Sequence, residues 1–148
     1  MTKPPPATLR IGALARLSGQ SVHAIRWYEA QGLIPGVERD RGGRRTYVAD
    51  HVEHLRFLDR LRITGMTIAE MRRYCELSMR GWRTLPERQA LLREHRRRVE
   101  AEIADLHAAL DMIDAKVAWY GEWAENRKRP PPLPEPPPRR RGRRPTIA

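Results

Sequence analysis

Four arginines around a pair of glycines are the residues of this sequence whose type and spacing most clearly suggest chemistry. Gly42 and Gly43 lie at the centre of residues 37–48, and the flanking arginines are Arg39, Arg41, Arg44 and Arg45. A Gly-Gly pair between two short segments is typical of a hairpin turn. Guanidinium groups offer a fork of N–H donors that fits phosphate oxygens. We therefore predict a basic hairpin, or wing, that lies on phosphates.

The other reactive side chains do not combine into a catalytic or metal-binding site. The sequence has no nucleophile beside a base, no paired carboxylates in an apolar setting and no phosphate-cradling glycine loop, so we expect no enzyme activity and no catalytic residue. The five histidines lack ligand spacing, and we expect no metal and no cofactor. Cys75, the single cysteine, falls on the apolar face of a predicted helix, where a buried thiol acts as a small hydrophobic group.

Charge is spread unevenly along the 148 residues, whose formal net charge is +11. Residues 1–50 carry +4, residues 51–126 are neutral and residues 127–148 carry +7. Basic ends around a balanced middle indicate a polyanionic partner at the ends and a self-association surface between them. No apolar run suits a signal peptide or a membrane span, and one cysteine fits a reducing compartment. We therefore expect a cytoplasmic protein with no membrane partner.

Two short helices are predicted before the wing. The first ends at Gly19, a residue suited to the left-handed conformation, and Ser21 offers a hydroxyl that caps the second. The apolar residues expected to face inward are Ile11, Leu14, Ala15 and Leu17 in the first helix, then Val22, Ile25 and Leu33. Two helices joined by a tight glycine turn predict a helix-turn-helix.

Three pairs of residues match the capping box that opens a helix: Asp50 with Glu53, Thr67 with Glu70, and Thr84 with Glu87. Pro86 would lie in a first turn, where its missing N–H costs nothing. The apolar face of the third helix is predicted to comprise Val52, Leu55, Leu58 and Leu61, and that of the fourth Ile68, Met71, Cys75 and Met79.

Residues 86–125 show an apolar heptad pattern within one long helix. One position of the heptad holds Leu92, Val99, Leu106, Ile113 and Tyr120, and the other holds Ile103, Leu110, Val117 and Ala124, with Arg96 as an interruption. Such a helix extends roughly 60 Å. A narrow stripe on so long a helix needs a partner, and a second copy of the chain is the simplest one. We predict a homodimer; the alternative is packing against the chain's own domain.

These elements predict a mainly α fold, a winged helix-turn-helix DNA-binding domain followed by a long dimerising coiled-coil helix. The expected boundaries are a flexible N-terminus at residues 1–8, the DNA-binding domain at 9–82, the coiled coil at 83–126 and a tail at 127–148. The tail is rich in proline and arginine and is predicted to be disordered. Its arginines could contact phosphates or only keep the chain soluble.

In its ordered series of motifs, the sequence resembles the MerR family of bacterial transcription regulators. The matching residues are Ile11-Gly12-Ala13-Leu14-Ala15, Gly19-Gln20-Ser21-Val22, Ala24-Ile25-Arg26-Trp27-Tyr28-Glu29, Gly32-Leu33-Ile34-Pro35, Gly43-Arg44-Arg45-Thr46-Tyr47, Leu61-Arg62 and Gly65-Met66-Thr67. The resemblance implies that Ser21, His23 and Arg26 face the major groove. It implies phosphate contacts for Tyr28, Arg39, Arg45 and Tyr47. Trp27 and Arg44 stand where the family carries other residues and join the expected DNA-binding set.

The resemblance also implies a mode of action. Family members usually pair their long helices antiparallel and distort the spacer between two promoter elements, so that RNA polymerase can use them. Residues 83–88 and the long helix resemble a small branch without an effector domain, linked to aldehyde or thiol stress. That branch senses through a cysteine in the third helix, where this sequence has Arg60. The resemblance leaves open a small-molecule inducer.

Two functions from different classes fit these features. The first is a promoter regulator that responds to a signal and binds a specific sequence. The alternative is an architectural DNA-binding protein with little sequence preference, whose basic ends bind phosphates. The two differ in sequence selectivity and in how much affinity the tail supplies.

Overall fold

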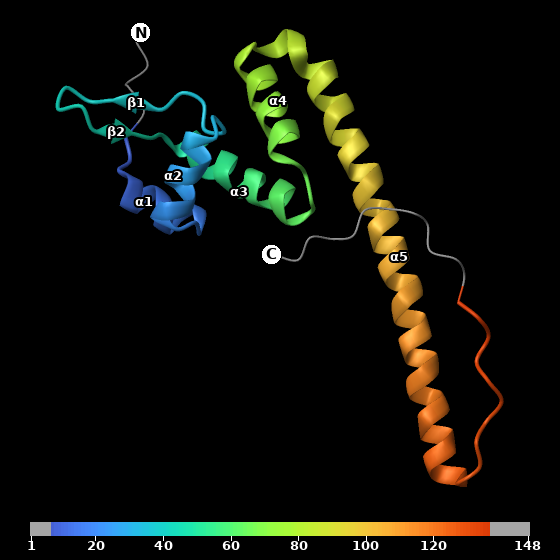
Figure 1. Ribbon diagram of the computed structural model, residues 1–148. Helices are drawn as coiled ribbons and strands as arrows, with labels where there is room; N and C mark the ends of the chain where they lie inside the picture. Colours follow the sequence, from blue (N-terminus) through green and yellow to red (C-terminus); the bar gives the residue numbers. More distant parts are fainter. Residues whose placement is uncertain (1–6, 137–148) are drawn as a thin grey trace. The chain divides into compact units, whose positions relative to one another are not determined.

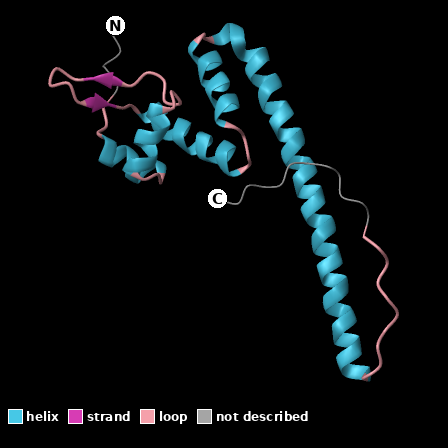
Figure 2. Ribbon diagram, in the orientation of Figure 1, coloured by secondary structure: helices cyan, strands magenta, loops and turns pink. Residues whose placement is uncertain are grey.

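A computed structural model describes residues 7–136 of the chain. The described residues divide between His95 and Arg96 into two compact units. The fold is mainly helical and follows the predicted order, a winged helix-turn-helix followed by one long helix (Figures 1 and 2). The predicted fold class is therefore confirmed.

The helix-turn-helix consists of α1 (Ile11–Ser18) and α2 (Val22–Ala30). Gly19 adopts φ 74°, a left-handed conformation that ends α1, and its N–H bonds to the carbonyl of Ala15. Leu14 and Ile25 are fully buried, as predicted, but Leu17 is half exposed. Ser18 is buried in its place, because the helix turns its last residue toward the core.

The wing is a two-stranded antiparallel hairpin of β1 (Glu38–Arg39) and β2 (Arg45–Thr46). Glu38 pairs with Thr46, and Arg39 pairs with Arg45. A bridge between Leu9 and Tyr47 attaches the segment before α1 to the end of the hairpin. The wing is thereby tied to the helix-turn-helix at its base.

Helices α3 (Ala49–Ile63) and α4 (Ile68–Met79) complete the core of the first unit. Val52, Leu55, Leu58 and Leu61 are all buried, as predicted. Met79 is 71% exposed, so its predicted place inside is wrong, and Leu77 is buried instead. Leu77 and Met79 lie 200° apart on a helix, which places them on opposite faces.

Only one of the three predicted capping boxes forms. Thr67 and Glu70 exchange the two hydrogen bonds of the box at the start of α4. Helix α3 begins earlier than expected, and the Nδ1 atom of His51 accepts the N–H of Val48 at 2.9 Å in place of Glu53. Glu53 instead forms an ion pair with Arg56.

The third box fails because both of its side chains bond elsewhere. A short 3-10 helix, η1 (Trp82–Thr84), precedes α5 (Leu85–Asn126). The Thr84 hydroxyl donates back toward the carbonyls of Leu77 (2.6 Å) and Gly81 (2.9 Å). Glu87 pairs with Arg73. Pro86 does lie in the first turn of α5, as expected.

The second unit comprises the part of α5 after residue 95 and the described part of the tail. Residues 127–136 form no helix or strand. They are nevertheless in contact with α5, since the indole N–H of Trp119 donates to the carbonyl of Pro131 at 2.7 Å. Residues 1–6 and 137–148, on which parts of the terminal predictions fall, lie outside the described residues.

Candidate nucleic-acid interface

The exposed face of α2 brings together three of the predicted contact residues. His23, Arg26 and Trp27 are exposed and stand at positions i, i+3 and i+4, which share one side of a helix. Arg26 forms no ion pair with any residue between 7 and 136, so its guanidinium faces solvent. Ile25 and Tyr28 occupy the opposite face and anchor the helix in the core.

Ser21 lies at the N-terminal end of the same helix. Its Oγ accepts the N–H of Ala24 at 3.0 Å, which caps α2 as the sequence predicts. The hydroxyl proton remains available to donate. Trp27 contacts Tyr28 edge to face, with ring centroids 5.3 Å apart, and its ring is partly exposed beside Arg26.

The turn of the wing is organised around the carboxylate of Asp40. Its Oδ1 accepts the backbone N–H groups of Gly42 and Arg44, both at 2.9 Å. Its Oδ2 accepts Arg10 at 2.6 Å, and this bond is the main reason that the pKa of Asp40 is lowered. Gly43 adopts φ 78°, a conformation that favours glycine. The predicted Gly-Gly turn therefore forms.

The arginine side chains of the wing point outward from this turn. Arg39, Arg41, Arg44 and Arg45 are all exposed. Arg39 donates to the carbonyl of Gly43 at 2.6 Å across the hairpin, which orients its guanidinium group. Exposed guanidinium groups on a rigid hairpin form a surface suited to phosphate.

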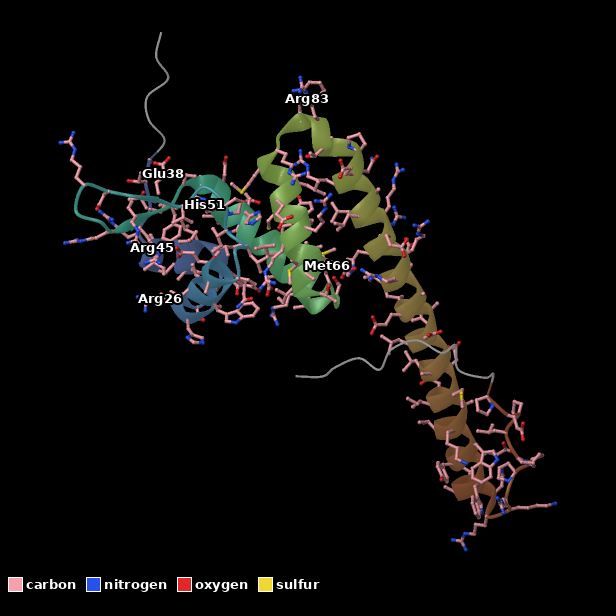
Figure 3. The ribbon with its side chains drawn as sticks, turned by 45° about the horizontal axis from the view of Figure 1, so that its top comes forward. Arg26, Glu38, Arg45, His51, Met66 and Arg83 are labelled. Atoms are coloured by element: carbon pink, nitrogen blue, oxygen red, sulfur yellow. The ribbon has the colours of Figure 1, made fainter. Side chains whose placement is uncertain are left out.

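A charged contact joins the wing to α2. Arg45 forms an ion pair with Glu29, and the Tyr47 hydroxyl donates to the other carboxylate oxygen at 3.4 Å. The hydrogen bond to Glu29 is the largest cause of a raised Arg45 pKa. Arg26, Glu29, Ala30 and Arg45 line one shallow hollow between wing and helix. Figure 3 shows Arg26 and Arg45 on the same side of this domain.

Tyr28 and Tyr47 are placed differently from what phosphate contacts require. Their exposures are only 2% and 0%. The Tyr28 hydroxyl accepts the Nε–H of Arg62 at 3.1 Å, and burial raises the pKa of both tyrosines. In the free chain these rings fill the core behind the candidate surface. Neither ring offers phosphate an accessible face without a rearrangement.

Two arginines that support α2 were not predicted from the sequence. Arg62 of α3 bonds the Tyr28 hydroxyl and pairs with Asp59 at 3.0 Å. Arg72 of α4 donates its Nε–H to the carbonyl of Gln31 at 2.8 Å, just after the end of α2. These pairs are 34 and 41 residues apart in sequence, so no local pattern reveals them.

The chemistry of Cys75 matches its interpretation as a small hydrophobic residue. Its side chain is buried, its Sγ lies 3.4 Å from the Leu33 carbonyl, and burial raises its pKa to about 11. A neutral, buried thiol is a poor nucleophile. Within residues 7–136, no group of three or more His, Cys, Asp or Glu side chains could hold a metal ion. No helix in that range could cross a membrane.

A second exposed surface lies on α5 beyond residue 96. The predicted seam residues Ile103, Leu106, Leu110, Ile113, Val117 and Tyr120 are exposed large apolar side chains. Val99 is half-buried. Leu92 differs, since it packs against the core of the first unit and offers less surface to a partner. The apolar stripe is therefore clearest from Ile103 to Tyr120.

Comparisons with known proteins agree with this architecture. Residues 9–78 match the family model described as MerR HTH family regulatory protein, and residues 52–116 match the one described as MerR, DNA binding. An uncharacterized HTH-type transcriptional regulator from Haemophilus influenzae is 33% identical over 102 residues, which cover 69% of this chain and 76% of that protein.

Solved structures show the same likeness. HiNmlR, a MerR family regulator lacking the sensor domain and bound to promoter DNA, matches with a TM-score of 0.70 and 30% identity, covering 80% of this chain and 94% of that one. A putative MerR family transcriptional regulator from Listeria monocytogenes matches with a TM-score of 0.72 and 33% identity, covering 76% and 86%. On this evidence the chain belongs to the MerR family and is a DNA-binding transcriptional regulator.

Proposed function

We propose that this regulator binds promoter DNA as a homodimer, with α2 in the major groove and the wing on the flanking phosphates. The observation that carries the proposal is the exposed face of His23, Arg26 and Trp27 beside the arginines of the wing. A helix with unpaired polar side chains, held rigidly from behind by Tyr28 and Arg62, has the geometry that base readout requires.

Each residue has a separate role in the proposal. Arg26 reads a guanine edge through two N–H groups, and His23 and Ser21 contact neighbouring bases or the backbone. Arg39, Arg44 and Arg45 bind phosphates, and Trp27 packs against the sugar-phosphate backbone. Tyr28 and Tyr47 position α2 and the wing, a role that fits their burial better than direct contact.

Dimerisation follows from the apolar stripe on α5. Leu106 and Val117 are 63% and 65% exposed, a large cost for isolated side chains of this type in water. A second copy presents an identical stripe, and two helices with narrow apolar seams bury them by pairing. A two-fold dimer would read an inverted repeat.

The dimer would act by changing the shape of the DNA between two promoter elements. Bending or untwisting of a spacer alters how RNA polymerase meets those elements. The free-energy cost of this deformation is lower at flexible base steps, and the phosphate contacts of the protein offset it. The relative HiNmlR is bound to promoter DNA. Because the proposed regulator acts on promoter DNA together with RNA polymerase, its proposed location is the cytoplasm.

The test is selection of bound sequences from a random duplex library with the full-length chain at moderate salt. An enriched inverted repeat is expected, and its centre should bend in a gel assay with permuted sites. Binding without any enriched motif that collapses as the salt concentration rises would refute sequence readout and favour an architectural role.

A matched pair of variants locates the contact. Arg26→Ala should cost about 1–3 kcal/mol of binding at the selected site and relax preference at one base pair in each half-site. Arg83→Ala removes the same charge from the far end of the domain, where Arg83 packs over Trp82 (Figure 3). It should leave base preference unchanged. Equal effects of both variants would contradict the assignment.

A further inference from the structure

The proline-rich segment that follows α5 contacts one flank of that helix. Arg127 adopts φ 53°, a left-handed conformation in which the chain leaves the helix, and its N–H bonds to the carbonyl of Trp123 at 2.9 Å. The segment then lies beside the end of α5 (Figure 1). Pro130 is buried, although the stretch around it is otherwise exposed.

The contact has the chemistry by which proteins bind polyproline. Proline-rich chains keep an extended shape and leave their carbonyls unpaired, and aromatic grooves bind them through ring contacts and side-chain donors. Here Trp119 donates its indole N–H to the Pro131 carbonyl at 2.7 Å. Trp119 and Trp123 meet edge to face at 5.0 Å, which supplies the aromatic surface.

Two cations contact the Trp119 ring. Lys116 lies 4.1 Å from the centre of the Trp119 ring, and the Arg129 guanidinium lies 5.7 Å from it. Positive groups over the face of an indole ring are attracted by its electron density. Arg129 also lies 5.8 Å from Trp123, so it joins the segment to both tryptophans. Trp119 is left only 7% exposed.

This flank borders the apolar seam but is not part of it. Trp119 precedes the seam residue Tyr120 and therefore lies about 100° around the helix from it. If Trp119 were uncovered, it would join Trp123 and the seam in one wide apolar face. A narrow seam favours two helices, whereas a wider apolar face can bury itself against several.

We propose that the flank of α5 formed by Lys116, Trp119 and Trp123 is a polyproline-binding surface occupied by the chain's own residues 129–136, and that this docked segment limits self-association to the seam. The second half of the statement rests on the proposed homodimer, and the first half does not. The docked segment thereby gives a function to part of a tail that composition alone marks as disordered.

Two shortened chains test the proposal with little change in charge. A chain that ends at Pro136 keeps the segment, and a chain that ends at Lys128 loses it. Residues 129–136 contain one arginine and one glutamate, so the two chains have the same net charge. Their helical content, measured by circular dichroism, should agree within a few per cent of signal, because α5 ends before either cut.

The first measurement is hydrogen exchange of the Trp119 indole N–H by NMR, with the signal assigned through Trp119→Phe. Exchange should be at least tenfold slower than that of the exposed Trp82 in the full-length chain and in the chain ending at Pro136. It should become as fast as that of Trp82 in the chain ending at Lys128. Equal exchange of Trp119 in both shortened chains would overturn the docking.

The second measurement is molar mass by light scattering. The chain ending at Pro136 should be a dimer, and the chain ending at Lys128 should form larger species that Trp119→Gln with Trp123→Gln returns to a dimer. A dimer of unchanged mass after loss of the segment would overturn the limit on self-association. A monomer for the chain ending at Pro136 would refute the proposed homodimer, while the indole exchange would still decide the docking.

Discussion

The two units of this chain treat their apolar side chains in opposite ways. In residues 7–95, most of the large apolar side chains of α1 to α4 form one buried cluster, and long-range hydrogen bonds from Arg62 and Arg72 hold α2 against it. Beyond residue 96, the large apolar side chains of α5 are mostly exposed, and Trp119 is the exception. The first unit has a buried core of its own, whereas the described part of the second exposes a continuous apolar stripe that a partner could bury.

The contrast teaches where each kind of function lies. A DNA-reading surface needs rigidity, because a base edge is recognised only by donors held in place. The packed core behind α2 supplies it. A dimerisation surface needs accessible apolar area, because burial of that area drives association. Substitutions that act on one unit and spare the other test this difference.

The largest effect is expected from a charge in the seam. Leu110→Glu would place a carboxylate of each copy in the apolar interface, where its desolvation opposes pairing. We expect the dimer to dissociate and the affinity for an inverted repeat to fall roughly 10²–10⁴-fold, the gain that two linked sites normally provide. Light scattering and a binding titration measure these two quantities.

The control for this prediction is Ala108→Glu. Ala108 is exposed and lies on the side of α5 away from the seam, so the same charge there should leave the dimer intact. Dissociation by both variants, or by neither, would contradict the assignment of the seam to residues 103–120.

A substitution in the core of the first unit and one in the seam of α5 should differ in how the loss of unfolding free energy depends on protein concentration. Leu58 is fully buried in the first unit, and Leu58→Ala should lower the free energy of unfolding by about 2–5 kcal/mol through lost burial and a cavity. Urea denaturation that follows the unfolding of the first unit should give the same loss of unfolding free energy at every protein concentration. Leu106→Ala should instead give a loss that is largest at high protein concentration and disappears once both proteins are diluted to monomers, because its contacts form between copies. If the loss of unfolding free energy depended on protein concentration in the same way for both variants, the proposed difference between the two units would be wrong.

Local patterns predicted most of the fold and little of what supports the site. The glycine at the end of α1, the Ser21 cap and the Thr67-Glu70 box act within a few residues, and all three form. The Gly-Gly turn forms for the same reason. The predictions that Leu17 and Met79 are buried were wrong. Both residues lie in the last turn of a helix, where no following turn continues the apolar pattern and shows which face is buried.

Contacts between segments that are distant in the sequence could not be predicted. Tyr28 and Tyr47 look like phosphate ligands in the motif, yet whether a ring faces solvent depends on α3 and on the segment before α1. The docking of residues 129–136 is likewise hidden, since a proline-rich composition predicts only that the segment forms no core of its own. The partner that holds it, Trp119, lies 12 residues away from Pro131.

A smaller effect is expected where the wing meets α2. Glu29→Gln removes the negative charge that pairs with Arg45 and keeps a group that can still accept a hydrogen bond from Tyr47. Binding to unrelated duplex DNA should rise severalfold at low salt, because Arg45 then meets phosphate without a competing carboxylate. The ratio of specific to unrelated binding should fall roughly tenfold, about 1.4 kcal/mol, as the wing loses its fixed position. Titrations on a selected site and on an unrelated duplex measure the ratio, and an unchanged ratio would mean that Glu29 does not position the wing.

The smallest effect concerns the pH dependence of the first unit. His54 lies inside the domain, where burial is the largest cause of a pKa below its ordinary value of 6.5, and its Nε2 atom bonds the Leu33 carbonyl. The folded domain therefore binds this proton less readily than the unfolded chain does. Stability from this group is complete above pH 6.5 and is lost as the pH falls from there toward the folded pKa.

His54→Gln keeps a donor for the Leu33 carbonyl but has no group that titrates in this range. Between pH 7.5 and 5.0, the unfolding free energy of the wild-type chain should fall more than that of the variant, because the buried imidazole of His54 resists protonation in the folded domain. Urea denaturation at several pH values gives the difference. Parallel curves for the wild-type chain and the variant would show that burial of His54 does not couple the fold of the DNA-binding domain to pH.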